Sequence, residues 1–221
     1  KFPQRLKPIS LRPSLTTLSE AINHNQIYES LMQLNLAIYT PSNYIFPSKL
    51  DKYMDLSDKK GNNLTQAGRE EGIRRLMSIN LLKRLESSVY SFGLTLARIK
   101  NLISEMIKSI DAFDNNGSAI LDLIEISETS DFDLDDQNTD FFSVGKKVKI
   151  DLADMDYKSW RAELAMDAEN LELLTLMIAD ITPEYDTKLQ TLFKILAEKI
   201  KNPINVGNKK VLVFTAFSDT A

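Results

Sequence analysis

The chain contains no cysteine among its 221 residues. This absence excludes disulfide bonds, zinc sites built from thiolates and cysteine nucleophiles. There is one histidine, His24, which stands between two asparagines. A single histidine without a cysteine or a second histidine favours a polar junction residue over a metal ligand or a member of a catalytic triad.

Long apolar runs are also missing from the sequence. No run approaches the ~20 apolar residues that a membrane-spanning helix needs, and no secretory signal is present. The net charge is −4, with 43% hydrophobic and 26% charged residues, which is ordinary for a soluble globular protein. We therefore expect a cytoplasmic protein without a membrane partner, in which any nucleic-acid site is a local patch.

Proline is absent from residues 66–113, and this stretch predicts one long helix. Apolar residues recur there at alternating spacings of three and four, the heptad pattern of a helix with one continuous apolar stripe. The helix would have about 48 residues and be roughly 70 Å long, so it needs partner helices to cover its stripe. The stripe consists of Leu82, Leu85, Val89, Phe92, Leu96, Ile99, Ile103, Met106, Ile110 and Phe113.

Two further segments continue the alternation and supply such partners. The first runs from Trp160 to Ile181 with one polar lapse at Asp167, and the second runs from Tyr185 to about Lys201. The pattern predicts a mainly α fold, an elongated bundle of long antiparallel helices packed lengthwise. The same heptads equally suit a free-standing coiled-coil interaction module, whose seam recruits a partner protein or a second copy.

The segments outside the predicted helices differ in composition. Residues 1–65 carry several prolines and predict a connector with short helices. Eight acidic residues and no Lys or Arg lie between Asp122 and Asp140, which predicts a solvated loop near 127–145. We expect the long-helix bundle to span residues 66–201 and a separate part to occupy residues 202–221.

An apolar run, Val211 to Phe214, lies in this last part of the chain. A short run that is apolar on both faces predicts a single buried strand of a parallel sheet. The chain offers this strand no convincing partner strand. We therefore expect the chain to be a piece of a longer α/β protein.

Three blocks of the sequence follow one another in a familiar order: Asn80–Ser88 (NLLKRLESS), Asp186–Leu189 (DTKL) and Lys209–Ala221 (KKVLVFTAFSDTA). They resemble blocks of the bacterial Swi/Snf-type superfamily-two helicases, DEAD/DEAH-like DNA-dependent ATPases. The first resembles a block of the helical region between the two RecA-like lobes. The second resembles the approach to the second lobe. The third resembles the first strand and turn of that lobe, which carry helicase motif four.

The resemblance implies the inter-lobe helical region plus the start of the second RecA-like lobe. Such a piece would brace the two motor lobes and border the DNA channel. The chain has no Gly-x-x-x-x-Gly-Lys-Ser/Thr loop and no Asp-Glu-x-His box, so the resemblance implies no catalytic residue, metal site or cofactor here. ATP and Mg are expected for the intact parent, an ATP hydrolase, with double-stranded DNA and the missing RecA-like lobes as partners.

The resemblance also makes several basic and hydroxyl residues candidate DNA contacts. Residues 69–84 hold five basic and two acidic residues, although such a charge run is more usually a solvated helix face. Hydroxyls at the end of the predicted strand could bind phosphate, or could end the strand and cap the next helix. Phosphate contacts would position a duplex without reading its sequence. The candidates are Arg69, Arg74, Arg75, Lys83, Arg84, Lys209, Lys210, Thr215 and Ser218.

Overall fold

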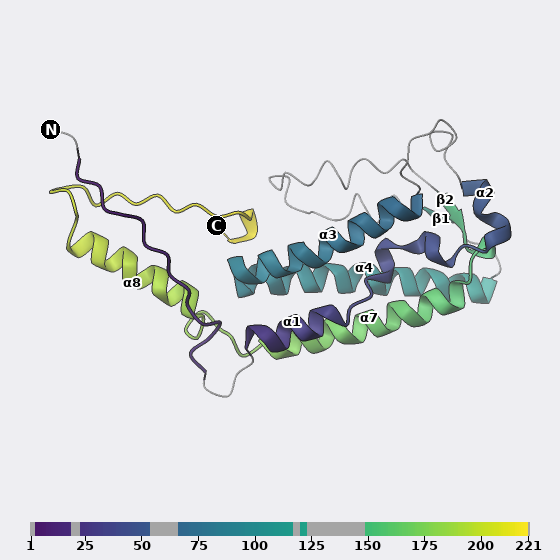
Figure 1. Cartoon of the computed structure of the whole chain (residues 1–221). Coiled ribbons are helices and arrows are strands. Elements are labelled where there is room, and N and C mark those ends of the chain that lie inside the picture. The colour runs from purple at the N-terminus through teal and green to yellow at the C-terminus, as the bar shows by residue number, and fades with distance from the viewer. Residues whose placement is uncertain (1–2, 19–22, 54–65, 117–119, 123–148, 221) are drawn as a thin grey trace.

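The computed structural model describes residues 3–18, 23–53, 66–116, 120–122 and 149–220. The protein is mainly α, as the periodicity predicts. Three long helices lie side by side (Figure 1), namely α3 (Gln66–Ser87), α4 (Val89–Asn116) and α7 (Tyr157–Ile178). The shorter helix α1 (His24–Met32) packs against α7 and α3. Among the described helices, none combines the length and the apolar character that crossing a bilayer requires.

Helices α4 and α7 are antiparallel along their whole contact. Arg161 in the first turns of α7 binds Asp111 near the end of α4, with Nε 2.5 Å from Oδ1. Farther along, Lys100 pairs with Glu172. At the other end of the pair, a Cβ atom on Gly93 would lie 3.3 Å from Cδ1 of Ile178, so glycine permits close approach of the two helices there.

The prediction of one continuous helix across residues 66–113 is wrong, because the chain reverses direction at Ser88 (Figure 1). The Ser88 N–H donates to the carbonyl of Arg84 at 2.9 Å, and the Ser88 carbonyl accepts from the N–H of Phe92 at 3.0 Å. The Ser88 hydroxyl also accepts from the N–H of Ser91 at 3.4 Å. Ser88 thus ends α3 and caps α4, a role that serine favours.

The apolar stripe is buried, and helices of the same chain bury it. Its eight members from Leu85 to Ile110 are 0–7% exposed. Leu82 and Phe113, at the two ends, are partly buried against the core. Since full burial of one such side chain contributes roughly 1.5–3 kcal/mol, this seam stabilises the hairpin of α3 and α4 together with α7.

Asp167, the polar position in the stripe of α7, fastens the N-terminal part to the bundle. Its Oδ1 accepts from the N–H of Asn35 and its Oδ2 from the N–H of Ala37, both at 2.8 Å. Leu36 between them has a φ of 51°, a left-handed conformation that residues other than glycine rarely adopt. Burial raises the pKa of Asp167, and the backbone N–H groups oppose that rise. The polar lapse in the sequence is therefore a structural acceptor.

Replacing Asp167 with asparagine is expected to destabilise the protein by about 1–3 kcal/mol. The amide keeps one acceptor oxygen, so one of the two N–H groups at Asn35 and Ala37 loses its partner. Urea unfolding at neutral pH measures the change. Glu163→Gln is the matched control, because Glu163 accepts from the side chain of Asn35 at an exposed site and the amide can still accept. Equal stabilities of the two variants would contradict this role for Asp167.

Helix α8 (Thr187–Lys201) is not the third rod of the bundle, so that interpretation is wrong. None of its residues is buried, and the helix lies apart from the bundle (Figure 1). It begins at the N-cap Asp186, whose side chain accepts from the N–H of Leu189 at 2.9 Å. Because α3 folds back on α4, α3 occupies the position in the bundle that the third helix was expected to fill.

The predicted strand at Val211–Phe214 is also wrong for this structure. These four side chains are 41–90% exposed, and residues 208–215 have no regular secondary structure. In the described part of the chain, the one sheet pairs β1 (Ile120–Asp122) with β2 (Lys149–Asp151), antiparallel. A strand needs a neighbour to satisfy its backbone hydrogen bonds, and among the described residues no strand pairs with this segment. The predicted acidic loop near 127–145 lies outside the described residues.

Candidate functional site

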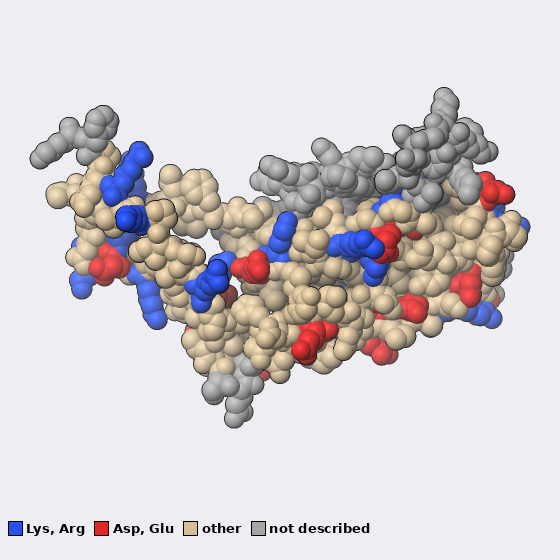
Figure 2. All heavy atoms as spheres, in the orientation of Figure 1, with Lys and Arg blue, Asp and Glu red and all other residues tan. Residues whose placement is uncertain are grey.

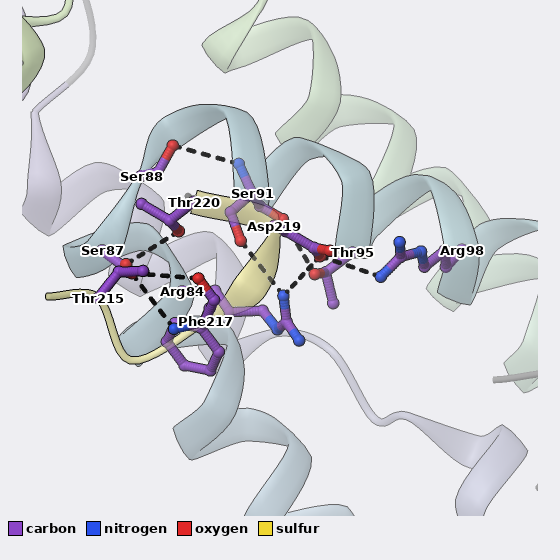
Figure 3. Close-up of polar contacts among 10 residues, drawn as sticks. All are labelled: Arg84, Ser87, Ser88, Ser91, Thr95, Arg98, Thr215, Phe217, Asp219 and Thr220. Carbon is purple, nitrogen blue, oxygen red and sulfur yellow. Dashed lines mark hydrogen bonds and ion pairs between the residues drawn. The ribbon is translucent and has the colours of Figure 1, made fainter. Parts of the chain in front are cut away.

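The tip of the α3–α4 hairpin receives the last described residues of the chain (Figure 3). A short 3₁₀ helix, η6 (Ser218–Thr220), contacts α4 there. We call this contact the hairpin–turn junction. Its members are Arg84, Ser87, Ser91 and Arg98 from the hairpin and Phe217, Asp219 and Thr220 from the C-terminal turn.

Arg84 is the centre of the junction. Its side chain is 2% exposed, and its Nη1 donates to Oδ2 of Asp219 at 2.9 Å. The same nitrogen lies 3.2 Å from the hydroxyl of Ser91. The guanidinium carbon is 4.6 Å from the centre of the Phe217 ring, a cation–π distance. A planar guanidinium with five donors can serve a carboxylate, a hydroxyl and an aromatic face at once.

Two further contacts secure the turn. Arg98 Nη1 lies 3.1 Å from the same Oδ2 of Asp219, so two guanidinium groups share one carboxylate. The hydroxyls of Ser87 and Thr220 are 3.1 Å apart. Asp219 is only 13% exposed, and breaking a buried ion pair by removing one partner typically costs about 3–5 kcal/mol. The junction is thus a specific attachment.

Helix α8 reaches the same hairpin tip through its first turn. Lys188 Nζ donates to the carbonyls of Glu86 and Ser87, at 2.5 and 2.9 Å. These carbonyls end α3, where the helix dipole favours a positive charge. The start of α8 and the C-terminal turn are therefore both attached to the reversal of the hairpin.

Thr215 closes a local turn. Its hydroxyl oxygen accepts from the N–H of Phe217 at 3.3 Å and donates to the carbonyl of Phe217 at 3.1 Å. The hydroxyl therefore holds a local turn, and because no strand directly precedes it, it does not end one as the alternative interpretation expected. Ser218 begins η6, directly before Asp219.

Two basic residues in the first half of α3, Arg74 and Arg75, are paired with one acid, Glu71. Arg74 binds Glu71 through two bonds of 2.6 and 2.9 Å, and Arg75 binds the same carboxylate at 3.1 Å. These guanidinium groups, Arg74 foremost, lower the pKa of Glu71 to about 2. One of the two positive charges is therefore neutralised within the helix.

The structure does not gather the nine predicted residues into one site. Arg69 and Arg74 are half-buried, while Arg75 and Lys83 are exposed. Arg84 is enclosed by the junction, which leaves no access for a phosphate in this conformation. Lys209 and Lys210 are exposed in the segment after α8.

Only Arg84 of the junction was among the predicted site residues. The structure adds six that the sequence reasoning missed: Ser87, Ser91, Arg98, Phe217, Asp219 and Thr220. A signal for two of them existed, because Arg84, Ser91 and Arg98 recur at intervals of seven and so share a face in a heptad pattern. Nothing local pointed to Asp219, which is 135 positions from Arg84 in the chain.

Within the described residues, no group of three or more His, Asp or Glu side chains is placed to hold a metal ion. Comparison of the chain with protein-family models, curated proteins and solved structures found no match. The features that bear on function are therefore the junction, the exposed segments and the distribution of charge.

Proposed function

We propose that the chain is the helical insertion and the first part of the second RecA-like lobe of an ATP-dependent DNA helicase or translocase. The observation that carries the proposal is the meeting of three blocks that lie far apart in the sequence. Asn80–Ser88 supplies Arg84 and Ser87, Asp186–Leu189 supplies Lys188, and the C-terminal block supplies Asp219 and Thr220. These are the blocks that resemble one helicase family.

The proposed role of the helical bundle is to brace the motor. A hairpin with a closely packed seam resists bending, because packed interiors transmit strain. Its tip is attached to the start of α8 through Lys188 and to the C-terminal turn through Asp219. A lobe built around these two attachments would move together with the hairpin. This arrangement lets the insertion set the position of the second lobe.

The exposed apolar segment supports the same proposal. Val211 to Phe214 place four large apolar side chains in water one after another, which is costly for a folded protein. A sheet of a RecA-like lobe would supply hydrogen-bonding neighbours and would cover both faces. The proposed RecA-like lobes would thus be the partners that cover this segment. They would also contain the binding sites for ATP and Mg.

The coiled-coil interaction module gains no support from the seam. Recruitment of a partner requires an accessible stripe, and the stripe from Leu85 to Ile110 is already covered by α3 and α7. We therefore favour the motor insertion over the free-standing module.

The test is ATP turnover by the longer protein that carries this chain, measured with and without duplex DNA. The proposal predicts that duplex DNA raises the turnover rate several-fold, because the lobes of such a motor close productively on bound DNA. Single-stranded DNA of the same length is the control. A turnover rate that duplex DNA leaves unchanged would remove the proposal's main support.

A further inference from the structure

A strongly basic region surrounds α8 and is built from segments near both ends of the chain. Residues 3–18 and 185–216 together hold nine basic and two acidic residues, a net charge of +7 in a chain of net charge −4. Figure 2 shows Lys and Arg side chains gathered over α8 and the N-terminal segment. The rest of the chain is therefore acidic, and the excess of basic residues is concentrated in these two segments.

The N-terminal segment is fastened along α8 at both of its ends. Thr16 forms an antiparallel bridge with Asp186 at the start of the helix. Beyond the far end of the helix, the side chain of Asn205 bonds the backbone of Gln4 twice, at 2.8 and 3.1 Å. Figure 1 shows the segment running beside the helix. The backbone that carries the basic side chains of this segment is thus held beside the helix.

Five exposed cations form what we call the α8 basic surface. The N-terminal segment contributes Arg5, Lys7 and Arg12, and α8 contributes Lys194 and Lys201, which are two turns apart on one helix face.

The two acidic residues of this region have other partners. Asp186 caps α8, and Glu198 accepts from the side chain of Asn202 at 2.7 Å. These bonds satisfy the carboxylate oxygens but leave both negative charges in place, and Glu198 lies between Lys194 and Lys201 on the same helix face. The five cations outnumber the two acids, and all five are exposed.

We propose that the α8 basic surface binds the phosphate backbone of duplex DNA. The proposal rests on the proposed function and adds to it a DNA contact outside the basic cluster of α3. The segment from Arg5 to Arg12 spans up to about 23 Å, and Lys194 and Lys201 are about 10 Å apart. Cations spread over such lengths can each neutralise a different phosphate, which releases counterions and gives binding without sequence readout.

An anionic lipid surface is also negatively charged and could attract the same cations. The arrangement of the five cations favours DNA as the partner. A helix that lies in a membrane interface carries its cations on its own polar face. Here three of the five cations come from a second segment, the extended N-terminal one that is held beside the helix. Cations carried along an extended segment and along a helix beside it are spread over a length, as the phosphates of a linear polyanion are, and this favours DNA over a flat layer of headgroups.

The test uses the full-length protein with Lys194→Gln and Lys201→Gln together. Binding to a labelled duplex is measured by fluorescence anisotropy over a range of salt concentrations. We expect the slope of log affinity against log salt to fall by about two, and affinity near 0.15 M salt to fall by about tenfold to thirtyfold. Lys108→Gln with Lys158→Gln is the control, because it removes the same charge from exposed positions on the bundle. The Lys194→Arg, Lys201→Arg variant should keep the wild-type slope.

A slope that coincides with that of the control variant would overturn the proposal. Loss of binding to phosphatidylserine vesicles with unchanged duplex binding would overturn it in favour of a membrane surface. The proposed function fails separately, when duplex DNA does not stimulate ATP turnover by the wild-type protein. Stimulated wild-type turnover with an unaltered salt slope in the variant would reject the α8 basic surface alone.

Discussion

Replacing Asp219 with alanine is expected to destabilise the protein by about 3–5 kcal/mol, because it leaves the buried guanidinium of Arg84 without its carboxylate. In a double-mutant cycle of Arg84→Ala and Asp219→Ala, we expect a coupling energy of about 1.5–3 kcal/mol, the range for hydrogen bonds to charged groups. Chemical denaturation of the two single variants, the double variant and the wild type measures the cycle.

Arg98→Ala is the control for this cycle. Arg98 binds the same carboxylate oxygen at 3.1 Å, but its side chain is 36% exposed. An ion pair at such a site contributes about 0–1 kcal/mol. Additive effects of the Arg84 and Asp219 substitutions would show that the two residues do not act as a pair, and the junction would lose its physical basis.

Spin labels at Gly72 and Lys108 are expected to lie about 15–25 Å apart, because antiparallel helices pack with their axes about 8–10 Å apart. The chain has no cysteine, so Gly72→Cys with Lys108→Cys provides one unique pair of labels. Both positions are exposed, and no atom lies within 4 Å of a Cβ built on Gly72. A single continuous helix would place the labels about 54 Å apart, so the two arrangements differ by roughly 30 Å.

The matched control places both labels on α4, at Tyr90 and Lys108. Eighteen residues of uninterrupted helix separate these positions, which gives about 27 Å in either arrangement. A distance near 54 Å for the Gly72 and Lys108 pair, with the control unchanged, would show that α3 and α4 form one rod.

Periodicity alone was sufficient to predict which side chains are buried along α4 and α7, although it also predicted a buried stripe in α8, where no residue is buried. The residues from Leu85 to Ile110 form the core because apolar side chains at alternating spacings of three and four share one helix face. The reversal at Ser88 escaped the same reasoning. Ser88 is neither proline nor glycine, and the apolar spacing from Leu85 to Val89 continues across it. A serine between two helices can cap the second helix while the heptad spacing of apolar residues continues across it.

Interactions between distant segments explain the other differences between the sequence predictions and the structure. The third helical segment was expected to run from Tyr185, whereas Asp186 caps α8 and the helix begins at Thr187. Arg84 was predicted to contact DNA from its place in a basic cluster and from the helicase resemblance. The sequence does not show that Asp219, 135 positions later, pairs with it. The α8 basic surface likewise depends on the pairing of Thr16 with Asp186. Local pattern predicts helices and their faces, but contacts over more than a hundred residues depend on the whole fold.

The proposed role of the hairpin–turn junction is tested most directly in the proposed motor protein, by comparing the DNA-stimulated ATP turnover of an Asp219→Ala variant with that of the wild type under conditions where both are folded. If the hairpin sets the position of the second lobe through Arg84 and Asp219, the variant should lose most of the stimulation while its affinity for duplex DNA is retained. Equal stimulation of the variant and the wild type would contradict the proposed role of the hairpin–turn junction.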